Sequence, residues 1–232
     1  MKTLGVIDKN ERIAELILNN HFLLLVLERF GVSLGVQEKT IEEICVENNI
    51  NISLFLGICD LHLNMDSIPR IVLENSDIQS VIGYLYRSHE YYKNEVLPKI
   101  SKQTKLISEN TDDLLFVLVE RFFEEYKTEV LKHLEYEEIV VYPYVKNLTI
   151  DRISSLGYRI KDYKNHHQDI ETKLYDFKNL LIKYLPDRED QSLRRDLLFE
   201  LFRFEKDLRI HTVIEEAILV PAIENLEKGS VL

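Results

Sequence analysis

The sequence predicts an all-α protein whose main part is an up-down-up-down four-helix bundle. Glycine and proline are sparse, with seven and five residues among 232, and this favours long helices. Over residues 78–228, apolar side chains recur at alternating steps of three and four. That is the period of an amphipathic helix, whereas a strand would show a period of two.

Breaks divide this part of the chain into four segments of roughly equal length. They fall at 66–69, 108–113, 147–151 and 185–187, where Ser, Thr, Asn, Asp or Pro residues can cap or stop a helix. Long helices joined by short connections pack as antiparallel neighbours.

Each predicted helix carries a histidine on its apolar stripe, and two of the stripes also carry a glutamate. The stripes are Ile82, Leu85, His89, Tyr92 and Val96; Leu115, Leu118, Phe122, Tyr126, Val130, His133 and Glu137; Ile160, Tyr163, His167, Ile170, Leu174, Phe177 and Leu181; and Leu201, Phe204, Leu208, His211, Glu215 and Leu219.

The first part of the chain has a different pattern and predicts a small domain of short helices. It holds both cysteines and four of the seven glycines, and its apolar runs alternate with polar turns. Thr40 followed by Glu43 predicts a capping box at the start of one helix. The expected organisation is a small helical N-terminal domain over residues 1–65, a linker over 66–77 and the bundle over 78–228.

Charge and composition exclude several classes of partner. The net charge of −11 argues against nucleic acid, which needs a basic face. The sequence contains neither a run of about 20 apolar residues, as a membrane span requires, nor a signal-peptide core at its start. The two cysteines, Cys45 and Cys59, cannot form a disulfide framework, so we expect a cytoplasmic protein without a membrane partner.

One pattern, H-x-x-x-E-E-x-x-x-x-P, occurs twice, at residues 133–143 and 211–221. Residues i and i+4 lie on one face of a helix, about 5–6 Å apart. Each copy therefore points an imidazole and a carboxylate in the same direction, His133 with Glu137 and His211 with Glu215. Two such helices facing each other would surround a metal ion with nitrogen and oxygen ligands.

Polar groups on a core face are costly unless they are paired or bound to a metal. A metal-free network of histidine and glutamate is the alternative to a metal site. On the third helix His166 competes with His167, which lies on the stripe and is the one we select. The predicted ligands are His89, His133, Glu137, His167, His211 and Glu215.

Two further glutamates, Glu138 and Glu216, point about 100° away from the predicted ligands, given 3.6 residues per turn. They could orient an imidazole N–H, or they could form solvated or ion-paired positions. His21 and His62 lie outside the four helices and are expected to be surface or capping histidines. Imidazole and carboxylate together suit iron, manganese or zinc, and paired carboxylates can bridge two ions.

Residues 78–228 resemble the hemerythrin-like HHE cation-binding domain, and most closely the iron-centre repair (RIC) di-iron proteins. The twice-repeated motif carries the resemblance. It implies a non-haem di-iron centre, in which His89, His133, His167 and His211 match the terminal imidazoles, and Glu137 and Glu215 match the bridging carboxylates. Zinc or manganese are possible substitutes for iron.

The sequence departs from the repair proteins in two places. Their additional histidine, about 21 residues after the first, is replaced by the stretch Ser108-Glu109-Asn110, so that Glu109, Asn110 or water could fill the position. The N-terminal region, at residues 26–35 and 39–50, also resembles theirs. Their cysteine pair is absent from Val32-Ser-Leu-Gly-Val-Gln, which puts a thiol-dependent role of this domain in doubt.

The resemblance implies a role in the nitrosative or oxidative stress response. The chain would bind or react with nitric oxide or dioxygen, with possible repair of iron–sulfur centres in a client protein. A sensor that binds the gas and signals to a protein partner without turnover is the main alternative, so enzymatic activity stays open. Metal storage, or a zinc-stabilised structural bundle, is a third. The small N-terminal domain could support a homodimer.

Overall fold

The computed structural model describes residues 7–64, 71, 73–109, 113–150, 158–163, 168–186 and 191–229. Within these residues the regular structure is helical, with an isolated β-bridge between Arg12 and Thr40 and no strand. The predicted all-α fold class is therefore confirmed. None of the described helices has both the length and the apolar composition needed to cross a membrane.

The described residues group into two compact units. The first lies within residues 1–87, 145–157 and 213–232, and the second within residues 88–144 and 158–212. The expected domain boundaries stay a prediction, and half of the expected linker, residues 66–70 and 72, lies outside the described residues.

Short helices form the N-terminal part of the first unit, as the sequence predicts. They are α1 (Ile13–Asn19), α2 (Leu23–Arg29), α3 (Ile41–Glu47) and α4 (Ile52–Leu63). The predicted capping box is confirmed, because the Glu43 backbone N–H donates to the Thr40 hydroxyl at 3.2 Å and the Thr40 N–H donates to the Glu43 carboxylate at 2.8 Å. Cys45 and Cys59 are both buried here as free thiols.

The long helices follow in chain order. Several of them are continued by a π-helical segment (η1, η2, η4, η5), and a separate 3₁₀ turn (η3) lies between α8 and α9 in the sequence. They are α5 (Asn75–Tyr91), η1 (Tyr92–Val96), α6 (Leu97–Ser108), α7 (Leu114–Tyr136), η2 (Glu137–Val141), α8 (Tyr142–Ile150), η3 (Ile160–Asp162), α9 (Gln168–Asn179), η4 (Leu180–Tyr184), α10 (Gln191–Val213), η5 (Ile214–Leu219) and α11 (Val220–Gly229).

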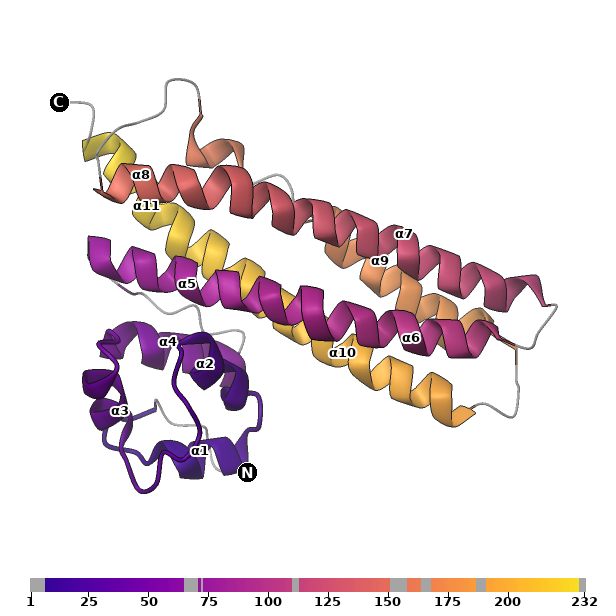
Figure 1. Cartoon of the computed structure of the whole chain (residues 1–232), viewed down its shortest axis with the longest axis horizontal. Coiled ribbons are helices and arrows are strands. Elements are labelled where there is room, and N and C mark those ends of the chain that lie inside the picture. Colours follow the sequence, from indigo (N-terminus) through magenta and orange to yellow (C-terminus); the bar gives the residue numbers. More distant parts are fainter. Residues whose placement is uncertain are drawn as a thin grey trace. The chain divides into compact units, whose positions relative to one another are not determined.

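The second unit is a four-helix bundle. Figure 1 shows α6, α7, α9 and α10 running side by side, and the short connection from α6 to α7 makes these two antiparallel. Asp113 caps α7 by accepting a hydrogen bond from the Leu115 N–H at 2.9 Å. The bundle core joins apolar side chains of all four helices, including Ile100, Val119, Leu174 and Leu201.

The core corrects the predicted stripe at the start of the second long helix. Leu115 and Leu118, which we expected to face the core, are 38% and 40% exposed, whereas Phe116 and Val119 are buried. All six residues from Leu114 to Val119 are apolar. The sequence pattern therefore does not show which side of this part of the helix faces the core. From Tyr126 onward the predicted stripe and the buried face agree.

The third helix also begins later than its stripe implied. Ile160–Asp162 is a short 3₁₀ helix, Tyr163 lies in a turn, and α9 begins at Gln168. Ile160 and Tyr163 are nevertheless fully buried. His166, His167 and Asn110 lie outside the described residues.

Every π-helical turn in the described residues ends two residues before a proline. The N–H groups of Leu97, Tyr142, Leu185 and Val220 each bond to the carbonyl five residues earlier, and the next residues are Pro98, Pro143, Pro186 and Pro221. A proline ring clashes with the carbonyl four residues before it and has no N–H. After η1, η2 and η5 the helix continues and accommodates the ring by widening for one turn, whereas after η4 the helix ends. Such π turns recur at functional sites.

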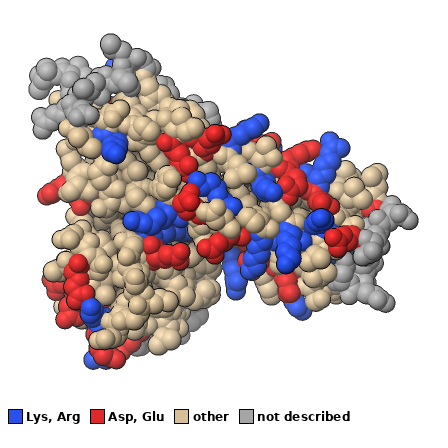
Figure 2. Space-filling view, viewed as in Figure 1, with Lys and Arg blue, Asp and Glu red and all other residues tan. Residues whose placement is uncertain are grey.

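Surface charges of both signs are mixed. On the face drawn in Figure 2, Lys and Arg side chains alternate with Asp and Glu along the bundle and do not gather into one basic area. Ion pairs such as Lys99–Glu200 at 2.8 Å and Lys127–Glu124 at 2.7 Å account for part of this mixing. The absence of a nucleic-acid partner stays a prediction.

Candidate metal centre

The first copy of the repeated motif lies where α7 passes into the π turn η2. His133 is in the last turn of α7, and Glu137 opens η2. Their side chains point the same way, as the i, i+4 spacing predicts, with His133 Nε2 2.9 Å from Glu137 Oε1. The second copy is placed equivalently, with His211 near the end of α10 and Glu215 in η5.

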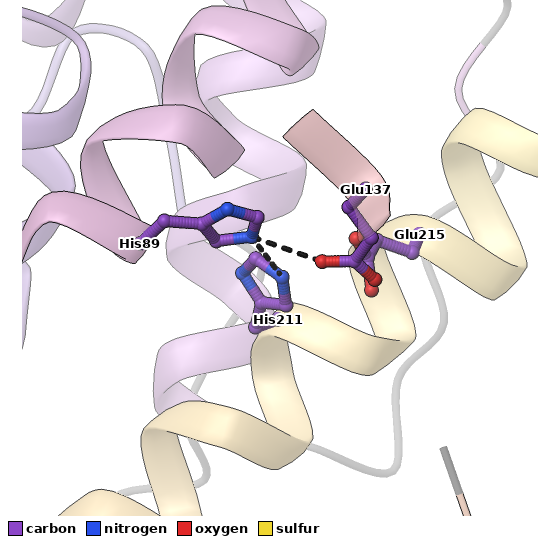
Figure 3. Close-up of side chains that lie close together, drawn as sticks. All are labelled: His89, Glu137, His211 and Glu215. Carbon is purple, nitrogen blue, oxygen red and sulfur yellow. Dashed lines mark hydrogen bonds and ion pairs between the residues drawn. The ribbon is translucent and has the colours of Figure 1, made fainter. Parts of the chain in front are cut away.

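Four of the predicted ligands lie together. His89, Glu137, His211 and Glu215 each offer one ligand atom, and these atoms are all within 4.8 Å of one another. Figure 3 shows the two imidazoles facing the carboxylates, with His211 and Glu215 one turn apart on the same chain segment. All four residues are at most 2% exposed.

Three polar atoms of other side chains surround the Nε2 atom of His89. It lies 3.1 Å from Glu137 Oε2, 3.3 Å from His211 Nε2 and 3.1 Å from the Tyr142 hydroxyl. Two donors that each lie about 2.1 Å from one ion, at right angles to each other, are about 3 Å apart. Separations of this size would allow His89, Glu137 and His211 to bind one ion.

The other nitrogen of His89 is held by Glu138. Its Nδ1 lies 2.9 Å from Glu138 Oε1, and Lys93 Nζ reaches the same oxygen at 2.9 Å. The hydrogen bond from His89, and secondarily that from Lys93, keeps the pKa of the Glu138 carboxyl below its usual range. Both roles expected for this glutamate are thus present, because it orients an imidazole and also pairs with a lysine.

Tyrosine hydroxyls approach the cluster at two points. Tyr142, the first residue of α8, bonds to His89, and Tyr163 donates to Glu137 Oε1. Tyr163 is fully buried and Tyr142 is 5% exposed. Each hydroxyl restrains a side chain that we predict to be a ligand.

Burial makes this cluster suitable for a cation. Two carboxylates in one buried volume repel each other, and an ionised carboxylate is costly to bury without compensation. Imidazole nitrogens and carboxylate oxygens are ligands for iron, manganese and zinc. The residues therefore fit a first-row transition metal, with Glu138 supplying the carboxylate–histidine hydrogen bond common behind metal ligands.

Comparison with known proteins agrees with this geometry. The family model of the hemerythrin HHE cation binding domain matches residues 80–223. The chain belongs to the hemerythrin HHE cation-binding family. The match includes both copies of the motif and all six predicted ligands. None of the curated proteins with which the chain was compared matches it.

Within this hemerythrin HHE domain, the structure brings four of the six predicted residues together, and His133 adjoins this cluster through Glu137. His167 lies outside the described residues. Glu109, one of the groups considered for the missing ligand position, is the exposed residue that ends α6. The ligand roles themselves stay a prediction.

Two expectations about other residues need correction or addition. His62 was expected to be a surface or capping histidine; it lies in the last turn of α4, but it is fully buried, with its Nε2 3.1 Å from the Tyr84 hydroxyl. His21 is exposed, as expected. Tyr142 and Tyr163 were not predicted as part of the site of this hemerythrin HHE domain. Pro143 could have indicated Tyr142, because the helix forms a π turn before this proline. In a π turn, a residue lies on the same side of the helix as the residue five positions earlier, which for Tyr142 is Glu137.

Proposed function

We propose that this hemerythrin HHE chain is a non-haem di-iron protein of the nitrosative or oxidative stress response. In this role it binds or reacts with nitric oxide or dioxygen. The buried cluster and the family membership support cation binding. The choice of iron and the gaseous ligand rest on the resemblance to the iron-centre repair proteins, and zinc or manganese remain chemically acceptable substitutes.

The observation that carries the proposal is the orientation of the Glu137 carboxylate. Its Oε2 lies 3.1 Å from His89 Nε2, and its Oε1 lies 2.9 Å from His133 Nε2. The two oxygens of one carboxylate therefore face two different imidazoles. A carboxylate that bridges two metal ions, each with its own histidine, has this orientation, whereas a single-ion site needs only one of the two oxygens.

The side chains at this site would have different roles. His89 and Glu137 would bind the metal, Glu138 would fix the tautomer of His89, and Tyr163 would hold Glu137 in place. Iron bound here would supply redox chemistry and an affinity for dioxygen or nitric oxide. The burial of the ligands would exclude bulk water from the bound gas and would strengthen the electrostatic interactions inside the site.

Repair of damaged iron–sulfur proteins is the finer form of this proposal. It draws support from the similarity of residues 26–35 and 39–50 to the domain that precedes the bundle in the repair proteins. The absent cysteine pair means that a repair role would not use thiols at that place, since Cys45 and Cys59 are buried. A client iron–sulfur protein and a cytoplasmic location are parts of this proposal.

The test is the metal content of the full chain and the coupling between its metal ions. Protein produced with iron should contain about two irons per chain, whose Mössbauer spectrum should show an interacting pair. Glu137→Ala should lose the coupled pair. The exposed Glu135, in the last turn of α7, supplies the matched control, because Glu135→Ala removes a carboxylate outside the cluster. Zinc alone, or a coupled pair that survives Glu137→Ala, would contradict the proposal.

A gas sensor without turnover is the second candidate. The replacement of the expected seventh ligand favours it, because a site with fewer protein ligands can bind a gas without being committed to one reaction. Anaerobic mixing of the reduced protein with nitric oxide separates the two. Consumption of many equivalents favours an enzyme, whereas tight binding that stops at the stoichiometry of the site favours a sensor that signals to a partner protein.

A further inference from the structure

Tyr142, in the first copy of the repeated motif, lies closer to the predicted metal ligands than a supporting residue needs to. Its hydroxyl is 3.1 Å from His89 Nε2, and its ring stacks on the His89 ring, with centroids 5.4 Å apart and planes inclined by 26°. With 5% of its surface exposed, it is part of the buried cluster.

The nitrogen that Tyr142 contacts is the one that must bind the metal. Nδ1 of His89 faces the Glu138 carboxylate, which can only accept a hydrogen bond when it is ionised. Nδ1 therefore carries the proton, and Nε2 carries the lone pair. The same Nε2 faces Glu137 Oε2 and His211 Nε2, which are two further predicted ligands.

A conflict follows from this assignment. The lone pair of Nε2 can accept the hydrogen bond of the Tyr142 hydroxyl or it can bind a metal ion, but it cannot do both. Once a metal is bound to Nε2, the hydroxyl can no longer donate to this nitrogen. Its oxygen already lies within ligand-to-ligand distance of the site, as do the Glu137 and His211 donor atoms.

We propose that Tyr142 is itself an oxygen ligand of the metal centre. This inference rests on the proposed function, in which the metal is iron. On binding, the phenolic O–H bond breaks, an iron–oxygen bond forms and one proton leaves to solvent. Tyr142 thereby adds a protein ligand to a site in which the histidine expected near residue 110 is missing.

The backbone explains why the first motif can supply such a ligand. Tyr142 follows Glu137 by five residues, and the π turn joins the Tyr142 N–H to the Glu137 carbonyl, so both residues lie on one side of the helix. In the second motif the corresponding residue is Val220, which follows Glu215 by five and offers no ligand atom. The repeat is therefore asymmetric in its oxygen donors.

Tyr163 is the matched comparison for Tyr142. It is also buried and also bonds to a predicted ligand, but its partner is the carboxylate oxygen Glu137 Oε1. A carboxylate oxygen has a second lone pair, so it can bind a metal and still accept this hydrogen bond. Tyr163 therefore has no conflict to resolve and stays a positioning residue.

The experiment loads the full chain with iron, oxidises it to iron(III) and records its visible absorption and resonance Raman spectra. A tyrosine oxygen bound to iron(III) produces a charge-transfer band and enhances the ring vibrations of the phenolate. We expect both signals in the wild-type protein and in Tyr163→Phe, and neither in Tyr142→Phe. Each substitution removes one oxygen atom and leaves the ring.

Iron content is measured on the same samples so that the possible failures are distinguishable. Bound iron without a phenolate signal in the wild-type protein would overturn this inference and leave the di-iron proposal intact. A signal that survives Tyr142→Phe, or that disappears in Tyr163→Phe alone, would overturn it as well. Failure of the wild-type protein to bind iron would overturn both proposals.

Discussion

Glu138 lies 2.9 Å from the Nδ1 atom of His89, although the two residues are 49 positions apart in the sequence. This contact determines which nitrogen of His89 faces the cluster. It also places a carboxylate behind an imidazole, an arrangement that raises the basicity of the metal-facing nitrogen. The adjacent residues Glu137 and Glu138 therefore act on the same imidazole from two sides.

Replacing Glu138 should weaken metal binding without removing a ligand. Because the loss of such a hydrogen-bond partner typically lowers metal affinity by 10–100-fold, we expect a decrease of roughly this size for Glu138→Ala. Competition with a chromophoric chelator measures the affinity. Glu135→Ala, the change of an exposed glutamate in the last turn of α7, should leave the affinity close to that of the wild-type protein. Equal losses in both variants would refute the role of Glu138.

Proline 143 should control the geometry of the site through the π turn. Pro143→Ala supplies an N–H that can bond to the carbonyl four residues earlier, so the segment can return to α-helical geometry. Tyr142 would then rotate away from Glu137, and we expect metal affinity to fall. The free energy of unfolding should stay the same or rise, because proline inside a helix costs about 3 kcal/mol. Metal titration and urea denaturation measure the two quantities.

Pro186→Ala is the control for this change. Pro186 follows the π turn η4, which contains none of the predicted ligands. Its substitution should leave metal affinity unchanged. If both proline variants bind metal like the wild-type protein, then the π turn η2 does not position the site.

Thr40 should contribute to the stability of the N-terminal helices. Thr40→Ala removes the oxygen that accepts the Glu43 N–H at the start of α3, and the loss of such a cap costs about 1 kcal/mol. Urea denaturation followed by circular dichroism measures this cost. Thr40→Ser keeps the hydroxyl and should be close to the wild-type protein, and a Thr40→Ala variant as stable as the wild type would contradict the prediction.

The same capping box should make the stability of these helices depend on pH. Hydrogen bonds from the Thr40 backbone, and then from its side chain, lower the pKa of Glu43 in the folded protein. A lowered pKa stabilises the folded state above the pKa of the unfolded glutamate. This contribution is lost as the pH falls through the lower, folded-state pKa. The pH dependence over the acidic range should therefore be weaker in Glu43→Gln than in the wild-type protein, and identical curves would argue against it.

Neither thiol should react in the native protein at neutral pH. Burial raises the pKa of Cys45 to about 12, and burial raises that of Cys59 further, so the reactive thiolate is scarce at both positions. A chromogenic disulfide reagent should label neither cysteine in buffer and both in urea. Rapid labelling of the native protein would show that these side chains are accessible.

The fold was largely predictable because helical periodicity and capping are local properties of the chain. The breaks near residues 108–113 and 185–187 coincide with the ends of α6 and η4 and with the start of α7. The prediction was wrong for Leu115 and Leu118, which are exposed. At that point the helix is apolar on all sides, and only its packing against the neighbouring helices selects the buried face.

By itself, the sequence determined the helical fold, the two motif copies and the pairing of His133 with Glu137. The i, i+4 spacing of a helix sets that contact whatever surrounds it. Tertiary structure alone decided that His89 Nε2 faces Glu137, that Glu138 holds Nδ1, and that Tyr142 enters the site. The first two contacts join different helices, and a 3.6-residue period does not show how one helix is rotated against its neighbour. The third depends on a π turn, whose extra residue also departs from that period.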